Sequence, residues 1–371
     1  MEDLFEMKEE LARGLQGVVR LCTHRNTGHD FACKSFFFDV EPAYPRHRCA
    51  AARLALNEVS ALAALSTHPN IVSLFAHFEQ PSAIHVILEL CRGGDLFQHL
   101  SQRQTDLKNI AGVHQYANGH THTQTNHEYS MSQSHNLDQK PEISTCWPLS
   151  EFEAAQIFAA ALRAVSHCHD HGFMHGDIKL ENLLLPREGC CYNDIRLSDF
   201  GFAAQFWIAN SGRRPVRGMQ GTLPYMAPET ISSVDDGDAN YDEKADIWSL
   251  GVLLYLLLCG ELPFPGKEAQ EVLDAMGILN SSNRWERRIE SLIESSLARD
   301  MLKRMLHLNP MKRYCANSLL THPWLQHHGL AGQVPTSRES QQMRECLLQA
   351  HLNIRRNMNS NSQQTQHLIQ A

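Results

Sequence analysis

The pattern of apolar and polar positions divides the chain into two unlike parts. In residues 1–91, short apolar runs are separated by turn residues, which predicts strands, and one stretch from Ala55 to Leu65 repeats apolar residues at helical spacing. From Leu149 onward, helical spacing dominates. The sequence therefore predicts a small β-rich part followed by a larger, mainly helical part, which is an α+β arrangement.

Two stretches lack this periodicity. Residues 101–148 are rich in His, Gln, Asn, Thr and Ser, and such a composition buries too little apolar area to offset the entropy lost on ordering. We therefore predict a disordered polar insert there, dividing a second region that spans residues 92–325. The tail, residues 326–371, is also rich in Gln and Asn, although Arg338 to Arg356 keeps apolar residues at helical spacing.

The longest apolar run, from Ile247 to Cys259, contains Ser249 and Gly251 and is shorter than the roughly 18 residues that a membrane span requires. We predict a buried core helix and no membrane contact. The chain starts with an acidic segment, Met1 to Asp3, without an apolar export region, and its 11 cysteines are scattered without paired spacing. These features favour reduced thiols in the cytoplasm or nucleus.

Composition and charge narrow the class of partner. The 371 residues are 43% hydrophobic, which is enough for one large core or for two smaller ones joined across a cleft. The net charge of -8 gives no electrostatic reason to expect nucleic acid. Basic partners are favoured instead.

The first candidate chemistry lies in the β-rich part. Gly14 and Gly17, within Ala12 to Val19, would let backbone N–H groups approach phosphate oxygens, although most such glycine pairs are ordinary turns. Lys34 follows at the end of the strand-like run Phe31-Ala32-Cys33-Lys34, and Glu58 lies on the predicted helix. Separately, each residue is equally well explained as a turn or a surface charge.

A second group of motifs follows in the helical part. His175-Gly176-Asp177-Ile178-Lys179-Leu180-Glu181-Asn182 is followed by Asp199-Phe200-Gly201, with Asp177 22 residues before Asp199. In this order after the glycines and Lys34, these segments resemble the motif set of the protein kinase family. The resemblance covers about residues 4–325.

The resemblance implies a two-lobed protein kinase fold with a small β-rich N-lobe and a larger, mainly α-helical C-lobe. It also implies ATP and Mg²⁺ as cofactors. Asp177 is then expected to orient the substrate hydroxyl and accept its proton, and Lys179 to neutralise charge on the transferred phosphoryl group. Asn182 and Asp199 are expected to hold magnesium, which prefers hard oxygen ligands.

The same resemblance implies a nucleotide pocket. Lys34 is expected to hold the α- and β-phosphates, with the Glu58 carboxylate fixing its ammonium group. Leu88 corresponds to the residue at the back of the pocket, while Glu89 and Cys91 correspond to the segment whose backbone binds adenine. The remaining pocket residues expected from the resemblance are Leu11, Ala12, Gly14, Gly17, Val19, Ala32 and Leu184.

Three further segments match the family in order: Gly221 to Glu229, Asp246 to Gly251, and Arg313. The resemblance implies a buried ion pair between Glu229 and Arg313. Lys179 and Thr222 resemble the corresponding residues of serine/threonine kinases, so the resemblance implies that Ser or Thr of protein substrates is the acceptor.

The segments Gly93 to Phe97 and Leu319 to Leu325 resemble the calcium/calmodulin-dependent kinase group. In that group, acids matching Asp95 and Glu181 bind an arginine three residues before the target, so we expect a substrate preference for basic sites in intracellular signalling. The alternative is that both acids are merely solvated. The tail from Arg338 to Arg356 is a candidate site for calmodulin or another regulatory partner.

Two departures from the family pattern keep other functions open. Gly176 stands where many kinases carry an arginine that clamps an activation-segment phosphate, so we expect activity without phosphorylation of that segment. Ala12 replaces the first glycine of the loop and adds a methyl group near the nucleotide, so we expect the loop to cover the phosphates less closely and activity to fall modestly. The alternatives are a pseudokinase or scaffold that binds nucleotide and partners without efficient catalysis, and a small-molecule kinase. Histidines around Cys168 superficially suggest zinc, but we expect no structural metal there.

Overall fold

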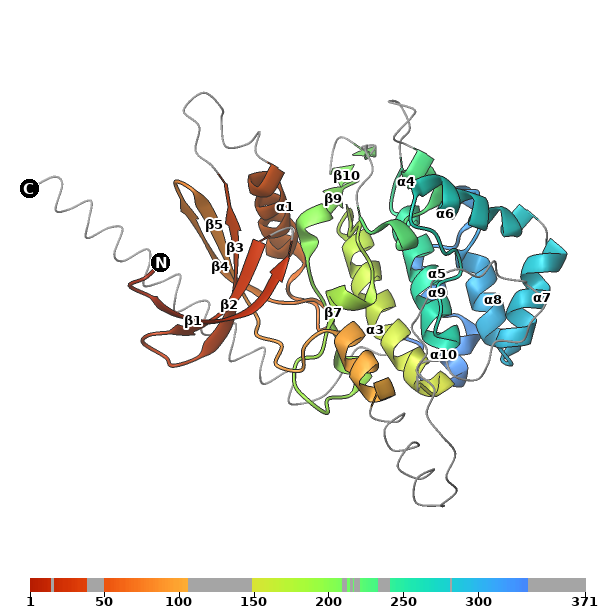
Figure 1. The fold of residues 1–371 in the computed structure, drawn as a ribbon, viewed down its shortest axis with the longest axis horizontal. Coiled ribbons are helices and arrows are strands. Elements are labelled where there is room, and N and C mark those ends of the chain that lie inside the picture. The colour runs from red at the N-terminus through yellow and green to blue at the C-terminus, as the bar shows by residue number, and fades with distance from the viewer. Residues whose placement is uncertain are drawn as a thin grey trace, which may run out of the picture.

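The computed structural model describes residues 1–14, 17–38, 50–105, 149–208, 212–213, 216, 221–232, 241–280 and 282–332. In these ranges the chain forms two lobes that lie side by side along the longest axis of the molecule (Figure 1). The smaller lobe is a twisted sheet with one helix, and the larger is mainly helical, as the sequence predicts.

The N-lobe is built on a five-stranded antiparallel sheet with the strand order β1-β2-β3-β5-β4. Its strands are β1 (Phe5–Gly14), β2 (Gly17–His24), β3 (Asp30–Phe37), β4 (Leu74–Gln80) and β5 (Ala83–Leu88). Helix α1 (Ala50–Leu65) packs against β3, β4 and β5, so the predicted helix from Ala55 to Leu65 is confirmed and begins earlier.

Alternation along β3 places Lys34. Successive side chains of a strand point to opposite faces of the sheet. Ala32 and Phe36 belong to the main core that includes α1, whereas Phe31 and Cys33 pack in a second cluster on the opposite face. Lys34 therefore shares its face with Ala32 and Phe36 and points toward α1.

The C-lobe contains the helical part of the sequence, together with three short strand pairs. Its helices are α3 (Glu151–Asp170), α4 (Pro228–Ser232), α5 (Lys244–Cys259), α6 (Ala269–Met276), α7 (Ser282–Leu292), α8 (Ser296–Met305), α9 (Ala316–Leu320) and α10 (Pro323–His327). The strand pairs are β6 (Phe173–Met174) with β9 (Ala204–Gln205), β7 (Leu183–Leu184) with β8 (Arg196–Leu197), and β10 (Trp207–Ile208) with β11 (Gly212–Arg213).

Helix α5 is the central element of the C-lobe. Side chains on all of its faces are buried, and it packs against α3 and α8, which confirms the predicted buried helix from Ile247 to Cys259. It ends at Gly260, whose φ of 73° is the left-handed conformation that commonly closes a helix. Among the described residues, no helix is both long and apolar enough to cross a bilayer.

The predicted insert begins later than residue 101. Residues 96–105 are helical, so the expectation of an irregular segment is wrong for residues 101–105. Leu96 and Leu100 are fully buried, and Arg103 forms an ion pair with Glu153 of α3, so this face of the helix is anchored. Residues 106–148 lie outside the described residues.

The folded C-lobe also extends slightly past residue 325. Helix α10 continues to His327, and Leu330 is buried in the main core. The rest of the tail, including the segment from Arg338 to Arg356, lies outside the described residues.

Candidate active site

Lys34 contacts one carboxylate in each lobe and joins the lobes through Asp199. Its Nζ lies 2.8 Å from Oε2 of Glu58 and 2.9 Å from Oδ1 of Asp199. Glu58 comes from the buried face of α1, and Asp199 follows β8 in the C-lobe. Three residues that the sequence singled out separately are thus brought together at the junction of the lobes.

The three groups adjust each other's ionisation. Burial by itself would lower the pKa of Lys34, but the Glu58 and Asp199 carboxylates outweigh it and the pKa is raised. Burial raises the pKa of Asp199, yet Lys34 outweighs that effect and the pKa falls below its usual range. For Glu58, burial outweighs Lys34 and the pKa is raised. At neutral pH, Lys34 is therefore a cation beside an ionised Asp199.

Asp199 has an unusual backbone conformation. Its φ of 61° is left-handed, and it is the one non-glycine residue with a positive φ in the described ranges. Such a conformation costs roughly 1–3 kcal/mol and persists when neighbouring contacts hold it. The next residue, Phe200, packs its ring 4.7 Å from that of His175, and His175 Nε2 donates to the carbonyl oxygen of Ser198 at 3.0 Å. These contacts fix the turn that presents the Asp199 carboxylate.

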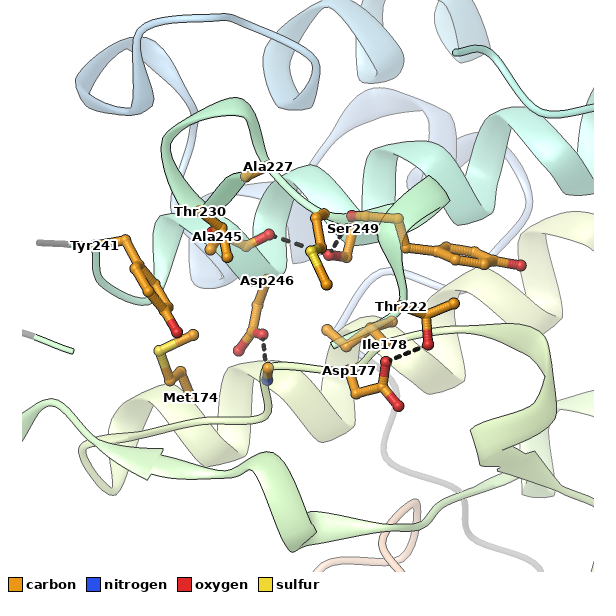
Figure 2. A pocket seen from close by; sticks show the side chains of 13 residues that line it. Met174, Asp177, Ile178, Thr222, Ala227, Thr230, Tyr241, Ala245, Asp246 and Ser249 are labelled. Atoms are coloured by element: carbon orange, nitrogen blue, oxygen red, sulfur yellow. Dashed lines mark hydrogen bonds between the residues drawn. The ribbon is translucent and has the colours of Figure 1, made fainter. Parts of the chain in front are cut away.

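Asp177 lies at the centre of a second polar cluster (Figure 2). Thr222 Oγ1 donates to Asp177 Oδ1 at 2.7 Å, and Lys179 Nζ lies 2.8 Å from Asp177 Oδ2. Lys179 Nζ also donates to Thr222 Oγ1 at 2.7 Å, which closes a triangle of three side chains. Asn182 Nδ2 donates to the Asp177 backbone oxygen at 2.7 Å and to Oδ2 at 3.1 Å.

Asp246 supports the backbone of this loop. It projects from α5 toward the loop backbone in Figure 2, and it accepts hydrogen bonds from the backbone N–H groups of His175 at 2.8 Å and Gly176 at 2.9 Å. His169 Nε2 lies 2.9 Å from the same carboxylate. Burial raises the pKa of Asp246, but the bond from His169 and the other donors outweigh it, so the pKa lies below its usual range. A buried carboxylate thus holds the loop that carries Asp177.

Two glycines allow the loop and the segment facing it to approach closely. Gly176 has a φ of +80°, and a Cβ added there would lie 2.9 Å from the carbonyl oxygen of Phe202. Gly221 has a φ of +109°, and its added Cβ would lie 2.5 Å from the carbonyl oxygen of Gly176. Glycine at position 176 therefore suits both the backbone conformation and this close approach.

The predicted ion pair between Glu229 and Arg313 is confirmed. Arg313 Nη1 and Nη2 donate to Oε1 and Oε2 of Glu229 at 2.6 and 2.7 Å, which is bidentate geometry. The Arg313 guanidinium also lies 5.0 Å from the ring centroid of Trp248 on α5. The pair therefore anchors the end of the segment that begins at Gly221.

The register of the N-lobe sheet brings several of the predicted pocket residues together. Ala12 pairs with Val19, Val19 pairs with Lys34, and Ala32 pairs with Leu88. In contrast, the side chain of Leu11 is exposed on β1. The nucleotide-binding roles of these residues stay predictions.

The other predicted pocket residues lie on the loop and at the junction of the lobes. A Cβ at Gly17, whose φ is +144°, would lie 2.3 Å from the carbonyl oxygen of Ser35, so glycine is required there, whereas Gly14 has open space around it. Leu184 forms a bridge with Asp95, and Cys91 is partly buried.

The donor set fits a magnesium nucleotide. Asn182 turns its amide nitrogen toward Asp177, so its amide oxygen is the atom able to bind a metal, and Asp199 contributes a carboxylate beside the Lys34 cation. Carboxylate and amide oxygens are ligands that Mg²⁺ accepts, and an ammonium group suits phosphate oxygens. Because position 17 must be glycine, no side chain there keeps a phosphate away from the backbone N–H groups.

Comparison with known proteins shows the family of the chain. A family model described as the protein kinase domain matches residues 5–119 and 102–325, so the chain belongs to the protein kinase family. The chain is 31% identical over 328 residues to the serine/threonine-protein kinase PEPKR2 of Arabidopsis thaliana, which covers 88% of this chain and 54% of that protein.

It is also 32% identical over 328 residues to calcium-dependent protein kinase 8 of Oryza sativa subsp. japonica, covering 86% of this chain and 48% of the relative. Calcium-dependent protein kinase 14 of Arabidopsis thaliana is 31% identical over 329 residues, covering 87% and 49%. The chain thus spans about half the length of these curated relatives.

The sequence did not reveal two features of this site. Thr222 was recognised only by its resemblance to serine/threonine kinases, whereas its bond to Asp177 joins residues 45 positions apart. Asp246 was recognised only as part of a motif, although it holds the loop at His175, 71 positions away. Nothing in the local sequence pattern specifies either partner, so only the folded structure identifies them.

Proposed function

We propose that the chain is an active protein serine/threonine kinase, which transfers the γ-phosphoryl group of Mg-ATP to a serine or threonine of a protein substrate. The observation that carries this proposal is the position of Lys34, whose Nζ is within 2.9 Å of both Glu58 and Asp199. A cation held in this way, beside a carboxylate able to bind metal, is an arrangement suited to a triphosphate.

The residues divide the chemical work. Asp177 orients the acceptor hydroxyl and takes its proton, and Lys179 neutralises charge that develops on the transferred group. Lys34 holds the non-transferred phosphates, and Asn182 and Asp199 are the ligands for metal. Magnesium, when bound, neutralises phosphate charge in a transition state that is loose and anionic.

The test is phosphate transfer to a generic basic peptide, with an Asp199→Ala variant as the control. We expect transfer by the unmodified protein and loss of nearly all transfer in the variant, because the variant lacks a metal ligand and a partner of Lys34. Equal signals in both proteins would contradict the proposal and favour a scaffold. Transfer only to small molecules would contradict the protein-kinase assignment.

A preference for arginine three residues before the target follows from the expected roles of Asp95 and Glu181. Asp95 also accepts a hydrogen bond from the backbone N–H of Gln98 at 2.9 Å, so it has a structural role at the start of the helix over residues 96–105. Glu181 is exposed to solvent. Both carboxylates carry the negative charge that a substrate guanidinium would bind, which supports the proposal.

A positional peptide library tests this preference. We expect enrichment of arginine at that position for the unmodified protein and loss of the enrichment in Glu181→Gln, which keeps the side-chain shape and removes the charge. No enrichment in the unmodified protein would remove the preference from the proposal while leaving the kinase activity standing.

Activity without phosphorylation of the activation segment is the remaining part of the proposal. Gly176 offers no guanidinium to a phosphate, and the backbone of Val216 pairs with that of Tyr241 through bonds of 3.3 and 3.2 Å. This pairing ties the segment to the chain preceding α5. Phosphatase treatment should therefore leave most activity intact, and loss of most activity would direct attention to Ser211, which lies outside the described residues.

Regulatory partners and location follow only from the sequence. Calmodulin or another partner binding at Arg338 to Arg356 stays a prediction, because this segment lies outside the described residues. A cytoplasmic or nuclear location and the absence of nucleic-acid partners also stay predictions.

A further inference from the structure

A buried ion pair joins the two lobes behind the candidate site and has no part in the steps above. Arg196 Nε lies 3.1 Å from Oε1 of Glu89, and the two side chains are 4% and 9% exposed. Glu89 directly follows β5, in the segment expected to bind adenine through its backbone. Arg196 begins β8, three residues before Asp199.

Each partner of the pair is itself fixed to its own lobe. Glu89 Oε2 accepts a hydrogen bond from the backbone N–H of Ser73 at 3.2 Å, and the Glu89 N–H donates to the Ser73 carbonyl at 2.9 Å. Arg196 Nη1 donates to the carbonyl oxygen of Asp194 at 2.6 Å. Both ends of the ion pair are therefore held at the backbone, so a change in the pair is transmitted to the chain.

Strand β8 has further bonds to the connection between α1 and β4. The N–H of Leu197 donates to the carbonyl oxygen of Asn70 at 2.8 Å, and the N–H of Val72 donates to the carbonyl oxygen of Leu197 at 3.0 Å. These backbone bonds keep β8 attached when the ion pair is removed. They make a graded displacement of Asp199, rather than detachment of the strand, the expected effect of losing Arg196.

Burial of this pair points to geometry more than to stability. Desolvating two charges can cancel their attraction, so a buried pair is weak support for net stability. The Arg196 guanidinium, which bonds to Glu89 through Nε and to the Asp194 carbonyl through Nη1, instead fixes one relative position. Here that position relates the segment expected to bind adenine to the strand that carries a metal ligand. One nucleotide has to reach both places.

We propose that Arg196 is a positioning residue for nucleotide binding: by holding the Glu89 carboxylate, it sets the distance between the adenine-binding segment and Asp199. This inference rests on the proposed function. It assigns Glu89 a side-chain role in addition to the backbone role expected from the sequence. Its consequence is that ligands touching both places depend on the pair, whereas ligands touching only the adenine segment do not.

The experiment compares Arg196→Met with the double variant Arg196→Met/Glu89→Leu. Arg196→Met leaves an unpaired buried carboxylate, so the midpoint of thermal unfolding should fall, whereas the double variant removes both charges and should recover most of it. Binding is measured by calorimetry with a non-hydrolysable Mg-ATP analogue and, separately, with adenosine. We expect affinity for the Mg-nucleotide to fall about tenfold in both variants, while affinity for adenosine changes less than about twofold.

Two further variants complete the test. Arg196→Lys keeps the charge and should recover part of the Mg-nucleotide affinity. Arg288→Met breaks a C-lobe ion pair, in which Arg288 Nη2 lies 3.0 Å from Glu261 Oε1, and it should lower thermal stability without changing either affinity. If Arg196→Met does not fold, the double variant and Arg196→Lys carry the comparison.

The inference would be overturned if the double variant bound the Mg-nucleotide as tightly as the unmodified protein. It would also be overturned if adenosine and Mg-nucleotide affinities fell together, because that result indicates a general disturbance of the adenine segment. Steady-state kinetics should show a raised KM for ATP with kcat changed less. Failure of the unmodified protein to transfer phosphate contradicts the proposed function instead, and the calorimetric comparison separates these two outcomes.

Discussion

Replacing Thr222 by valine removes the hydroxyl that joins Asp177 to Lys179. In the structure, this hydroxyl donates to Asp177 Oδ1 and accepts from Lys179 Nζ, both at 2.7 Å. Valine keeps a branched side chain of similar size, so the change acts mainly on hydrogen bonding. Asp177 then keeps its contact with Lys179 at 2.8 Å, but one of its two oxygens loses the threonine donor.

The magnitude follows from the number of bonds lost to charged groups. A hydrogen bond to a charged partner contributes about 1.5–3 kcal/mol, and Lys179 retains its contact with Asp177, so we count the loss as one such bond. If that energy is lost in the transition state, kcat falls by about 10- to 150-fold. Thermal stability should change much less, because Thr222 is only partly buried and Asp177 keeps its bonds from Lys179 and Asn182.

The assay is steady-state phosphorylation of a basic serine peptide at saturating ATP. Thr222→Ser is the matched control, because it retains the hydroxyl and should keep kcat near that of the unmodified protein. An unchanged kcat in Thr222→Val would refute the reasoning. Equal losses in the serine and valine variants would also refute it, because they would assign the effect to the methyl group.

Three other changes test the supports around the site. Arg313→Met leaves Glu229 unpaired and should reduce the free energy of unfolding by about 3 kcal/mol. This is the lower end of the range for breaking buried pairs, because Glu229 is partly exposed. An unchanged urea midpoint would argue against this. Gly221→Ala places a Cβ 2.5 Å from the Gly176 carbonyl oxygen, so kcat should fall at least about tenfold with no change in nucleotide affinity. An unchanged kcat for peptide phosphorylation would show that the loop adapts to the added methyl group. The folded-state pKa of Asp246 is lowered, so its contribution to stability is present at neutral pH and is lost as the pH falls below about 4. Asp246→Asn should therefore flatten the acid side of a plot of unfolding free energy against pH, measured with urea. Parallel plots for the two proteins would contradict this.

The sequence was most informative where periodicity decides the structure. Helical spacing predicted the helix from Ala55 to Leu65, which is part of α1, and the uniformly apolar run in α5 predicted a buried helix. The order of the motifs then predicted that Lys34, Glu58 and Asp199 would act together. The structure brings these three side chains within contact distance.

The sequence was less informative where composition was averaged over a long segment. Residues 101–105 belong to the helix that begins at residue 96, because Leu96 and Leu100 bury one face of it. The polar residues that follow concealed this boundary. Composition identifies the character of a segment but not the residue at which a neighbouring helix ends.

Long-range polar contacts could not be predicted from the chain. Arg196 and Glu89 are 107 positions apart, and each by itself is typical of a solvated surface charge. Periodicity determines which face of an element is buried, whereas the pairing of polar side chains depends on how separate elements pack. For that reason, the sequence predicted the backbone role of Glu89 but not its carboxylate partner.

Single-turnover transfer from γ-labelled ATP to a basic serine peptide tests the central claim most directly, with Asp177→Asn as the comparison. Asparagine keeps the size of the side chain and removes the carboxylate that orients the hydroxyl and takes its proton. We expect the variant to bind Mg-ATP as the unmodified protein does and to transfer label at least about 100-fold more slowly. Equal transfer rates in the two proteins, or no transfer by either, would contradict the assignment of this site to phosphoryl transfer.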